Sequence, residues 1–390
     1  MELVALRIAF DIAALDSGGA ERQTLEVASG LSAAGHDVLV IVNKSVRHFA
    51  EYFDRVQIIE LGRSHRWDAR VVPDVRRALR AFRADVCVCV LFNASLWGRM
   101  SAASLGCPVV VAEHSTKAKT PLAEHLTNIL LNRATAAVVA CAEAQIAALV
   151  RGGHERRKIR VVRNGVNVER FSRDAHGARE LRASQDIPSD ASLIMLVAAH
   201  RAEKRHDRFV SLVETLDDLG APAWGLMVGG GPLLDRTKEL AAASSASNRL
   251  RIAGSIADMP AAYSAADVVV LVSDDVETFP LSFLEAQACE VPVVGMDTGG
   301  VGETLLDGQT GFLVEQGDLP EMASITAALL ADPERRARIG EAGRGFVTAQ
   351  LSIAAMVDGY LRVLEEVIGT AGGVRGDSGL AGEGPSDPED

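Results

Sequence analysis

Short apolar segments alternate with amphipathic helical segments along most of the 390-residue chain. Several of the apolar segments, such as Val38–Val42 and Val268–Val272, are apolar at successive positions rather than at every second one. Strands of this kind are covered on both faces, as in parallel sheets that carry helices on either side. The alternation therefore predicts a doubly wound α/β protein. The predicted strands are Leu6–Phe10, Val38–Val42, Val56–Leu61, Val86–Phe92, Val109–Ala112, Ala136–Ala140, Ile159–Val162, Leu193–Ala198, Gly225–Val228, Leu250–Ile252, Val268–Val272 and Val291–Gly295.

The chain length and one turn motif predict two domains. Domains contain roughly 100–200 residues, and the turn Asn164-Gly165-Val166-Asn167 separates two series of strands. We expect an N-terminal domain over 1–168 and a C-terminal domain over 169–349, with a helix at about 350–368 completing the first domain. Residues 371–390 are rich in Gly, Ser, Pro and acidic residues, which predicts a disordered tail.

Composition excludes several classes of protein. The five cysteines contain no Cys-x-x-Cys pair, so neither a disulfide framework nor a zinc knuckle is supported. No apolar run is long enough to span a membrane, so a transmembrane helix is not expected. No basic segment precedes an apolar one at the N-terminus, so we expect a cytoplasmic protein without a signal peptide. The net charge of −12 argues against nucleic acid as a partner. Residues 1–170 nevertheless carry +6, which would suit an anionic partner.

Two glycine-rich loops each follow a predicted strand and precede a helix. Gly18-Gly19 comes after the first strand, and Gly229-Gly230-Gly231 follows a strand of the second half. Glycines allow close backbone approach, and a helix N-terminus offers free N–H groups to a phosphate. Neither loop has the spacing of a dinucleotide fingerprint or a P-loop. Taken alone, each loop is equally well explained as an ordinary turn.

Charged residues follow two strands of the second half. Arg201 and Lys204 come directly after Leu193–Ala198, and Glu277 and Glu285 come after Val268–Val272. Ligands bind beyond the carboxyl ends of parallel strands, so both groups are candidates for one site. The cations suit an anion, although alone they are better explained as a solvated turn. Carboxylates near a core need hydrogen-bond donors, which sugar hydroxyls supply.

Together these loops resemble those of family-4 retaining glycosyltransferases. The resemblance rests on Arg201/Lys204, on Glu277-x7-Glu285 followed by Gly299-Gly300, and on Gly18-Gly19-Ala20-Glu21, and it covers nearly all of the chain except the tail. It implies a GT-B fold, in which two Rossmann-like domains face each other across a cleft. It also implies a transferase that moves a hexose-like sugar from a UDP- or GDP-sugar to an acceptor hydroxyl.

The resemblance also implies a role for each matched residue. Arg201 and Lys204 would neutralise the departing diphosphate, Glu277 would bind the transferred sugar, and Glu285 would bind the ribose. His114 would lie near the reacting carbon, although an isolated histidine after a strand is more often structural. His200, Arg205 and Glu290 stand where the family often has glycine, which puts the shape of those loops in doubt. The implied donor-binding residues are Gly18, Gly19, Gly230, Ile256, Thr278, Phe279, Pro280, Leu281, Glu285, Gly299, Gly300 and Val301.

The sequence contains no Asp-x-Asp pair. Metal-dependent sugar transferases usually hold a diphosphate-bound cation with such carboxylates, so we expect neither a metal nor any other cofactor. Fixed cations and helix dipoles would take the metal's place. The nucleotide sugar would be a co-substrate.

The acceptor is encoded weakly. We expect a glycan, a lipid-linked saccharide or a small molecule, as in polysaccharide or glycoconjugate biosynthesis. The segment Arg63–Arg83 contains seven arginines and two aspartates. It is either a solvated helix face or a surface for peripheral contact with an anionic membrane. Two other functions remain open, namely a nucleotide-sugar epimerase of the same architecture and a non-catalytic nucleotide-sugar-binding subunit.

Overall fold

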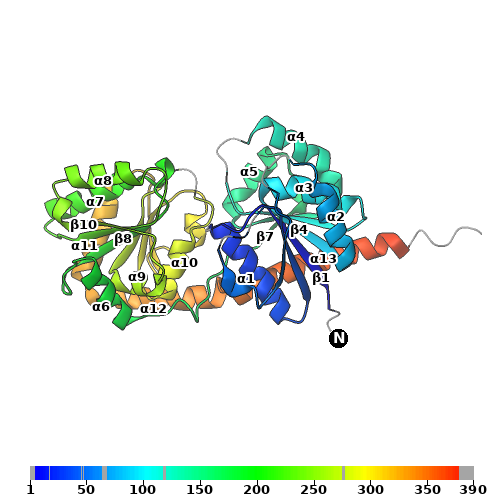
Figure 1. The fold of residues 1–390 in the computed structure, drawn as a ribbon. Helices are drawn as coiled ribbons and strands as arrows, with labels where there is room; N and C mark the ends of the chain where they lie inside the picture. The colour runs from blue at the N-terminus through cyan, green and yellow to red at the C-terminus, as the bar shows by residue number, and fades with distance from the viewer. Residues whose placement is uncertain are drawn as a thin grey trace, which may run out of the picture.

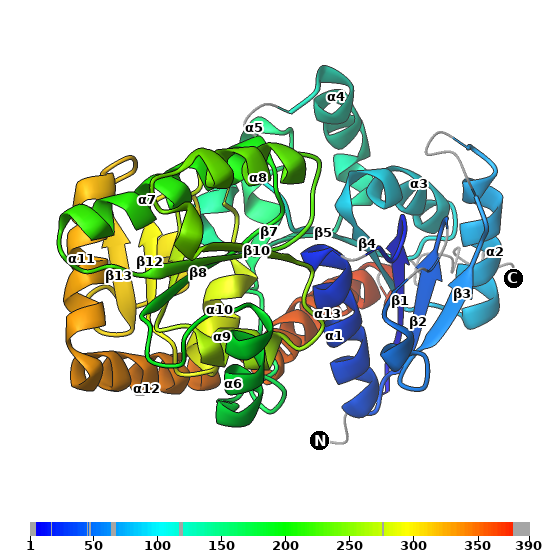
Figure 2. The ribbon, with the colours of Figure 1, turned by 60° about the vertical axis from the view of Figure 1, so that its left-hand side comes forward.

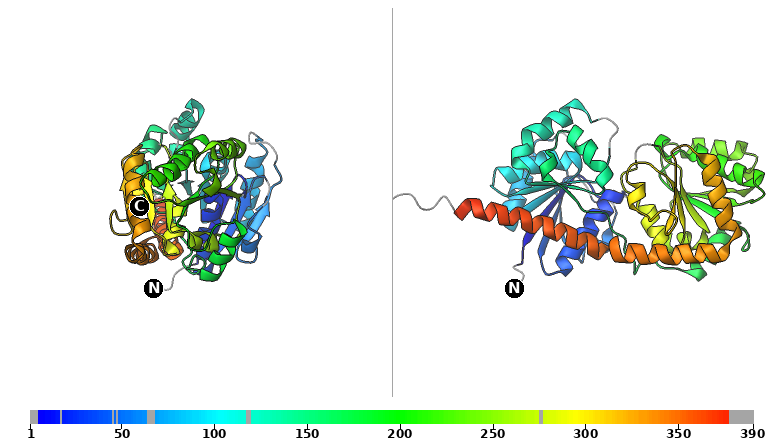
Figure 3. Two further views of the ribbon diagram at one scale, coloured as in Figure 1. Left: turned by 90° about the vertical axis from the view of Figure 1, so that its left-hand side faces the viewer. Right: turned by 180° about the vertical axis from the view of Figure 1, so that it is seen from behind.

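The computed structural model describes residues 5–16, 18–44, 46, 48–63, 68–116, 120–274 and 277–376. They form two parallel sheets, each flanked by helices (Figure 1). The two halves lie side by side, and a long C-terminal helical segment runs along both (Figure 3). The predicted doubly wound α/β architecture is therefore confirmed.

The N-terminal sheet has seven strands in the order β3-β2-β1-β4-β5-β6-β7. The order reverses at β1, which pairs with both β2 and β4. The strands are β1 Arg7–Ile12, β2 Asp37–Val42, β3 Gln57–Glu60, β4 Val86–Val90, β5 Val109–Glu113, β6 Ala137–Ala140 and β7 Ile159–Val161. The helices are α1 Gly19–Ala33, α2 Val71–Phe82, α3 Leu91–Ala103, α4 Leu122–Leu131 and α5 Ile146–Arg151, with short 3₁₀ turns η1 Ala50–Tyr52, η2 Asn132–Ala134, η3 Glu143–Gln145 and η4 Arg156–Lys158.

The C-terminal sheet has six strands in the order β10-β9-β8-β11-β12-β13. Its order reverses at β8, which lies between β9 and β11. The strands are β8 Leu193–Val197, β9 Trp224–Val228, β10 Leu250–Gly254, β11 Val268–Leu271, β12 Val293–Met296 and β13 Gly311–Val314. The helices are α6 Ala175–Ser184, α7 His206–Asp218, α8 Leu234–Ala243, α9 Met259–Ala265, α10 Leu281–Ala288, α11 Leu319–Ala331 and α12 Pro333–Gln350, with 3₁₀ turns η5 Ala202–Lys204, η6 Ser247–Arg249 and η7 Val301–Glu303.

Each predicted strand has a counterpart among β1–β12, with two departures. The strand predicted over Val86–Phe92 is too long, because the backbone turns at Leu91 (φ 62°) and enters α3. The edge strand β13, Gly311–Val314, was not predicted. It has only four residues and begins with glycine, so it lacks the β-branched run that marks the other strands.

The last helix, α13 (Ile353–Gly376), packs against the N-terminal sheet. Met356, Tyr360 and Leu364 are buried in the same core as the residues of β1 and α1. Gly30 of α1 allows this approach, because a Cβ there would overlap the side chain of Val357. Figure 3 shows α13 crossing behind the N-terminal domain.

The predicted tail begins too early. Residues 371–376 continue α13, because extending an existing helix adds one hydrogen bond for each residue that is fixed. The remainder of the predicted tail, residues 377–390, lies outside the described residues. Among the residues that are described, no helix has both the length and the apolar character needed to cross a bilayer.

Candidate active site

A cavity of about 1000 Å³ lies between the two domains, at the carboxyl ends of β1, β5, β8 and β11. Both sheets reverse their strand order there, which is where doubly wound sheets bind ligands. Figure 1 shows the domains facing each other, with α1 next to α10. The predicted residues that line the cavity are His114, Arg201, Lys204, Glu277, Gly18, Gly19, Ile256, Thr278, Phe279, Pro280, Leu281 and Glu285.

Four predicted donor-binding residues are not among those that line this cavity. Gly299 and Gly300 lie behind the loop that carries Glu277, where a Cβ would overlap the carbonyl oxygens of Glu277 and Thr278. Val301 is fully buried in the C-terminal core. These residues support the cavity wall from behind.

Gly230 also lies behind the wall. Its carbonyl accepts a hydrogen bond from the His200 N–H at 2.8 Å, next to Arg201. The neighbouring Gly229 (φ 141°) and Gly231 (φ 151°) adopt conformations that other residues rarely adopt. A Cβ on either would overlap the backbone that follows β8. This glycine loop therefore holds the end of β8, and with it Arg201, in place.

Lys204 and Glu277 form an ion pair inside the cavity. The Lys204 Nζ atom lies 2.5 Å from Glu277 Oε1, and the Glu277 residue is only 6% exposed. Lys204 ends η5 after β8, whereas Glu277 lies in the loop after β11. Neighbouring strands at the point where the order reverses therefore bring the two charges together. The pairing offsets the cost of burying the carboxylate.

Arg201 also lines the cavity, and it is exposed. It forms no ion pair with any residue in the described part of the chain. Its guanidinium charge is therefore not neutralised by those residues. A planar guanidinium with free N–H groups is suited to bind two oxygens of a phosphate.

Glu285 is held by one residue from each domain. It lies on α10, is 5% exposed, and accepts a hydrogen bond of 2.6 Å from the Tyr263 hydroxyl. Burial and the adjacent Glu285 carboxylate raise the pKa of Tyr263, so its hydroxyl stays protonated and donates. Arg22 of α1 completes the arrangement with an ion pair to Glu285 from the opposite domain.

Neither Arg22 nor Tyr263 was predicted as a site residue. Arg22 follows directly on the Gly18–Glu21 block, and its position in the first turns of a helix facing a site was a usable signal. Tyr263 is fully buried in α9 and carries no signal in the sequence that separates it from a core aromatic.

His114 follows β5 and faces the cavity from the N-terminal domain. Burial lowers the pKa of His114 to about 4, although the Asn164 side chain counteracts this. The imidazole is therefore neutral near pH 7. Its Nδ1 atom is buried and has no hydrogen-bond partner among the described residues. A neutral ring of this kind can exchange hydrogen bonds with a hydroxyl group.

Further hydrogen bonds join the domains next to the cavity. The Thr116 N–H donates to Thr278 Oγ1 at 2.7 Å, and the Thr278 hydroxyl donates to Thr116 Oγ1 at 3.0 Å. On the other side, the Gln23 side chain exchanges two hydrogen bonds of 3.0 Å with the backbone of Gly165. Gly165 belongs to the turn between the domains, so α1 is tied to that turn.

Two of the three positions where the family often has glycine adopt a backbone conformation that favours glycine. Arg205 (φ 48°) and Glu290 (φ 62°) adopt the left-handed conformation, which explains a preference for glycine there. Arg205 is held by ion pairs to Asp207 and Asp274. His200 is fully buried, and its ring stacks on a second histidine with centroids 4.0 Å apart.

The basic segment Arg63–Arg83 is partly neutralised by its own aspartates. Arg63 and Arg77 pair with Asp74, and Arg70 pairs with Asp68. Of the other four arginines, Arg66 lies outside the described residues. Arg76 and Arg80 lie on α2, and Arg83 follows it directly.

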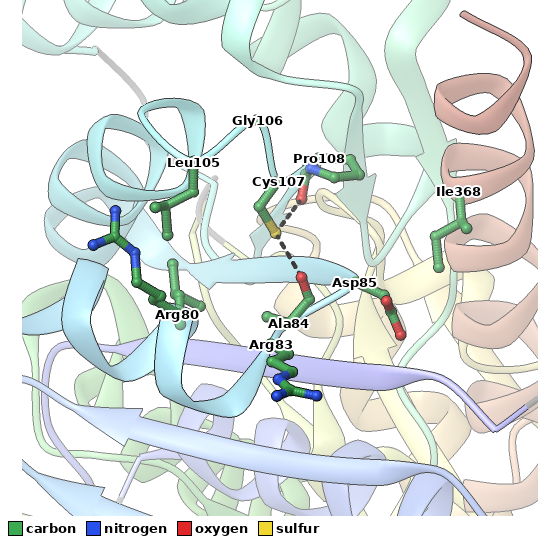
Figure 4. A pocket seen from close by; sticks show the side chains of 10 residues that line it. Arg80, Arg83, Ala84, Asp85, Leu105, Gly106, Cys107, Pro108 and Ile368 are labelled. Carbon is green, nitrogen blue, oxygen red and sulfur yellow. Dashed lines mark hydrogen bonds between the residues drawn. The ribbon is translucent and has the colours of Figure 1, made fainter. Parts of the chain in front are cut away.

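A second cavity of about 500 Å³ lies at the amino ends of β4 and β5, where the chain enters these strands (Figure 4). Arg80, Arg83 and Ile368 are among its lining residues. Cys107 faces it with Sγ contacts of 3.5 Å and 3.7 Å to the carbonyl oxygens of Ala84 and Pro108. The thiol therefore donates its hydrogen bond to backbone carbonyls of the protein itself. Over the ranges that the structure describes, this cavity shares no lining residue with the one between the domains.

Comparison with known proteins identifies the family. Residues 17–170 match the family described as Glycosyltransferase Family 4, and residues 178–346 match Glycosyl transferases group 1. The chain belongs to the family-4 glycosyltransferases. The structure of a glycosyltransferase from Rickettsia africae covers 93% of this chain and 99% of its own, with a TM-score of 0.81 at 21% identity. The structure of Anabaena HepE in complex with UDP covers 92% and 99%, with a TM-score of 0.78 at 18% identity. Both show that this chain has the GT-B fold.

Among curated proteins, a GDP-mannose-dependent alpha-(1-6)-phosphatidylinositol monomannoside mannosyltransferase of Mycobacterium tuberculosis is 31% identical over 209 residues. The match covers 51% of this chain and 54% of the mycobacterial protein. The chain therefore spans about half the length of the first curated relatives that it matches.

Proposed function

We propose that this protein transfers a hexose-like sugar from a UDP- or GDP-sugar to an acceptor hydroxyl, with retention of the anomeric configuration. The observation that carries the proposal is the cavity between the domains. At the carboxyl ends of β8 and β11 it contains a lysine, two buried carboxylates and an arginine that has no ion-pair partner in the described ranges. A nucleotide sugar combines a doubly charged diphosphate with hydroxyl donors, so it complements both kinds of group.

The diphosphate would bind where positive charge gathers. Arg201 and Lys204 supply fixed cations, and the N-terminus of α1, which begins at Gly19, supplies backbone N–H groups and the partial positive charge of the helix dipole. These groups stabilise the negative charge that develops on the leaving phosphate, which is the largest contribution expected from a site of this kind. The related HepE was crystallised with UDP, and the mycobacterial relative is named for GDP-mannose, so both bases are retained in the proposal.

The carboxylates would hold the two sugar rings of the donor. Glu285 would accept hydrogen bonds from the ribose hydroxyls, with Tyr263 fixing the orientation of the carboxylate. Glu277 would accept from the transferred sugar while its ion pair with Lys204 links the sugar to the diphosphate. The neutral ring of His114 would bind a hydroxyl on the N-terminal side of the cavity.

The proposed reaction needs no enzymic nucleophile. The bond between the anomeric carbon and the diphosphate oxygen breaks, and the acceptor oxygen forms its bond on the same face. The acceptor proton passes to an oxygen of the departing phosphate, so charges and atoms balance. The protein supplies positioning and electrostatic stabilisation.

No metal is part of the proposed mechanism. The fixed cations Arg201 and Lys204 would neutralise the diphosphate in place of a divalent ion. Within the described ranges, no three His, Cys, Asp or Glu side chains gather as metal ligands would. The proposed acceptors remain a glycan, a lipid-linked saccharide or a small molecule, and the proposed location is the cytoplasm.

A thermal-shift panel of nucleoside diphosphates and their sugars tests the proposal. A ligand present at 100 times its dissociation constant stabilises a protein by about 2.7 kcal/mol. We expect stabilisation by UDP or GDP that is lost in Arg201→Ala/Lys204→Ala and kept in the control Lys238→Ala, which removes an exposed lysine of α8. No stabilisation by any nucleotide would contradict the proposal. Incubation with the donor alone separates an epimerase, which would form a new nucleotide sugar without an acceptor.

A further inference from the structure

Helix α4 exposes an unusual number of large apolar side chains. Leu122 and Leu130 are 72% and 77% exposed, and Leu126 and Ile129 are each 49% exposed. The first two are the most exposed large apolar residues in the part of the chain that the structure describes. Figures 1 and 2 show α4 at the outer edge of the N-terminal domain, well away from the core of either sheet.

The opposite face of α4 is polar and buried, the reverse of an ordinary surface helix. Glu124 and Asn128 are 8% and 3% exposed. Asn128 accepts a hydrogen bond of 2.8 Å from the buried Arg99 and donates one of 2.9 Å to the Gly152 carbonyl. These bonds fix the rotation of the helix. The leucines therefore cannot turn inward without breaking a buried polar network, which would cost more than their burial gains.

Positive charge borders the apolar face. Arg133 follows α4 in η2. Arg151 is the last residue of α5, and its backbone carbonyl oxygen lies 2.9 Å from the Nδ1 atom of His125 on α4. Neither arginine forms an ion pair with a residue in the described ranges. Lys158 also reaches this end of the helix, where its Nζ donates to the Asn132 carbonyl at 2.6 Å, but its charge is paired with Glu155 at 3.4 Å, so the unpaired charge comes from the two arginines. The acidic residue of α4 is Glu124, which is buried.

An apolar face with a cationic border matches the surface of an anionic membrane. Leucines enter the boundary between headgroups and acyl chains, and arginines pair with anionic headgroups. A second copy of this chain fits less well, because it would bring the same two arginines to the contact. A stable dimer also buries ~800 Å² on each partner, with 20–30 residues, and α4 offers four large side chains.

We propose that α4 docks this protein on an anionic membrane, so that the acceptor is carried by a lipid. The inference rests on the proposed transferase function and specifies its acceptor class. The cavity residues His114, Ser115 and Thr116 follow β5, and α4 begins a few positions later at Leu122, so in this proposal docking through α4 brings the N-terminal side of the cavity to the membrane. A lipid-borne acceptor then reaches the cavity while its acyl chains stay in the bilayer. The docking surface is α4 rather than the Arg63–Arg83 segment, whose charge is partly neutralised by Asp68 and Asp74.

Co-sedimentation of the full chain with vesicles tests this surface. The vesicles are phosphatidylcholine alone and phosphatidylcholine mixed with phosphatidylglycerol, at physiological salt. We expect binding to the mixed vesicles that falls about a hundredfold in Leu122→Ser/Leu126→Ser/Leu130→Ser, since each leucine contributes about fivefold. The matched control Leu219→Ser/Leu306→Ser removes leucines that are 50% and 41% exposed in the C-terminal domain and should bind like the unmodified protein.

Binding of UDP and GDP is measured on the same preparations, because the two proposals can fail separately. Unchanged nucleotide binding shows that the triple variant is folded and that only docking is affected. Vesicle binding that is absent in the unmodified protein, or that survives in the triple variant, overturns the docking proposal. Dimerisation that the triple variant abolishes, without vesicle binding, also overturns it and assigns α4 to a second copy. Absence of nucleotide binding contradicts the transferase function instead.

Discussion

Lys204 has two separable effects in this structure, and a pair of substitutions distinguishes them. Its ammonium group compensates the buried carboxylate of Glu277 at 2.5 Å, and it also faces the proposed diphosphate position. Lys204→Met keeps the apolar stem and removes the charge. Glu277, at 6% exposure, is then left without its partner.

The expected loss of stability is moderate. Breaking a fully buried pair costs about 3–5 kcal/mol. The Lys204 side chain is 23% exposed and borders a large cavity, so we expect about 1–3 kcal/mol for Lys204→Met. The double variant Lys204→Met/Glu277→Gln removes the unpaired charge, and its free energy of unfolding should return to within about 1 kcal/mol of the unmodified protein. Urea denaturation measures both values.

Activity should not return with stability. Loss of one preorganised charge at a developing anion lowers kcat by about 100- to 1000-fold, and Glu277→Gln does not replace the lost cation. We therefore expect both Lys204→Met and the double variant to remain slow in a sugar-transfer assay. If the double variant recovered normal turnover, Lys204 would be only a structural partner of Glu277, and its assignment to the diphosphate would be wrong.

Three further outcomes follow from the structure. Tyr263→Phe removes one donor from the buried Glu285, so affinity for UDP or GDP in titration calorimetry should fall about tenfold, and an unchanged affinity would refute the ribose assignment. Burial raises the pKa of Asp11 from 3.8 to about 8, so between these pH values the folded protein holds a proton that the unfolded chain releases. The stability that this protonated carboxyl contributes is complete below pH 3.8 and is lost as the pH rises to about 8. Asp11→Asn should remove that loss, on the order of 5 kcal/mol between pH 4 and pH 8 in urea denaturation, and an unchanged pH profile would show that the buried Asp11 carboxyl is not its cause. Chelation with EDTA should leave the transfer rate within about twofold, whereas loss of activity that Mg²⁺ or Mn²⁺ restores would contradict the role assigned to fixed cations.

The fold could be predicted because its signal is local. Runs such as Val38–Val42 are apolar at every position, which only a strand covered on both faces requires, and β2 forms at Asp37–Val42. The strand predicted through Phe92 overran because the left-handed turn at Leu91 depends on packing of α3, which no local pattern records. The edge strand β13 was missed because four residues beginning with glycine do not differ from a loop.

Part of the candidate site could also be predicted from local sequence, because four of its charged residues directly follow predicted strands. Arg201, Lys204, Glu277 and Glu285 follow strands that meet at one edge, so strand order brings them together. Residues such as Tyr263 act through contacts between elements far apart in sequence, which spacing does not reveal. Gly299 and Gly300 show a further limit, since glycines that allow close packing cannot be told from glycines that approach a ligand by sequence alone.

Helix α4 shows the limit of periodicity most clearly. Leu122, Leu126, Ile129 and Leu130 have the spacing of a helix face that packs on a core. The structure buries the polar face instead, because Arg99 needs the amide of Asn128 as a partner. The hydrophobic pattern predicts which side chains lie together on one face of α4. The buried polar network decides that this face is turned to the outside of the domain and not to its core.

The most direct test of the central claim compares nucleoside monophosphates with diphosphates in titration calorimetry. If Arg201 and Lys204 bind the outer phosphate, UDP or GDP should bind the unmodified protein at least about tenfold more tightly than UMP or GMP. Arg201→Ala should abolish most of that difference while affinity for the monophosphate stays nearly constant. Equal affinity for monophosphate and diphosphate, or discrimination that persists in Arg201→Ala, would contradict the assignment of this cavity to a nucleotide-sugar diphosphate.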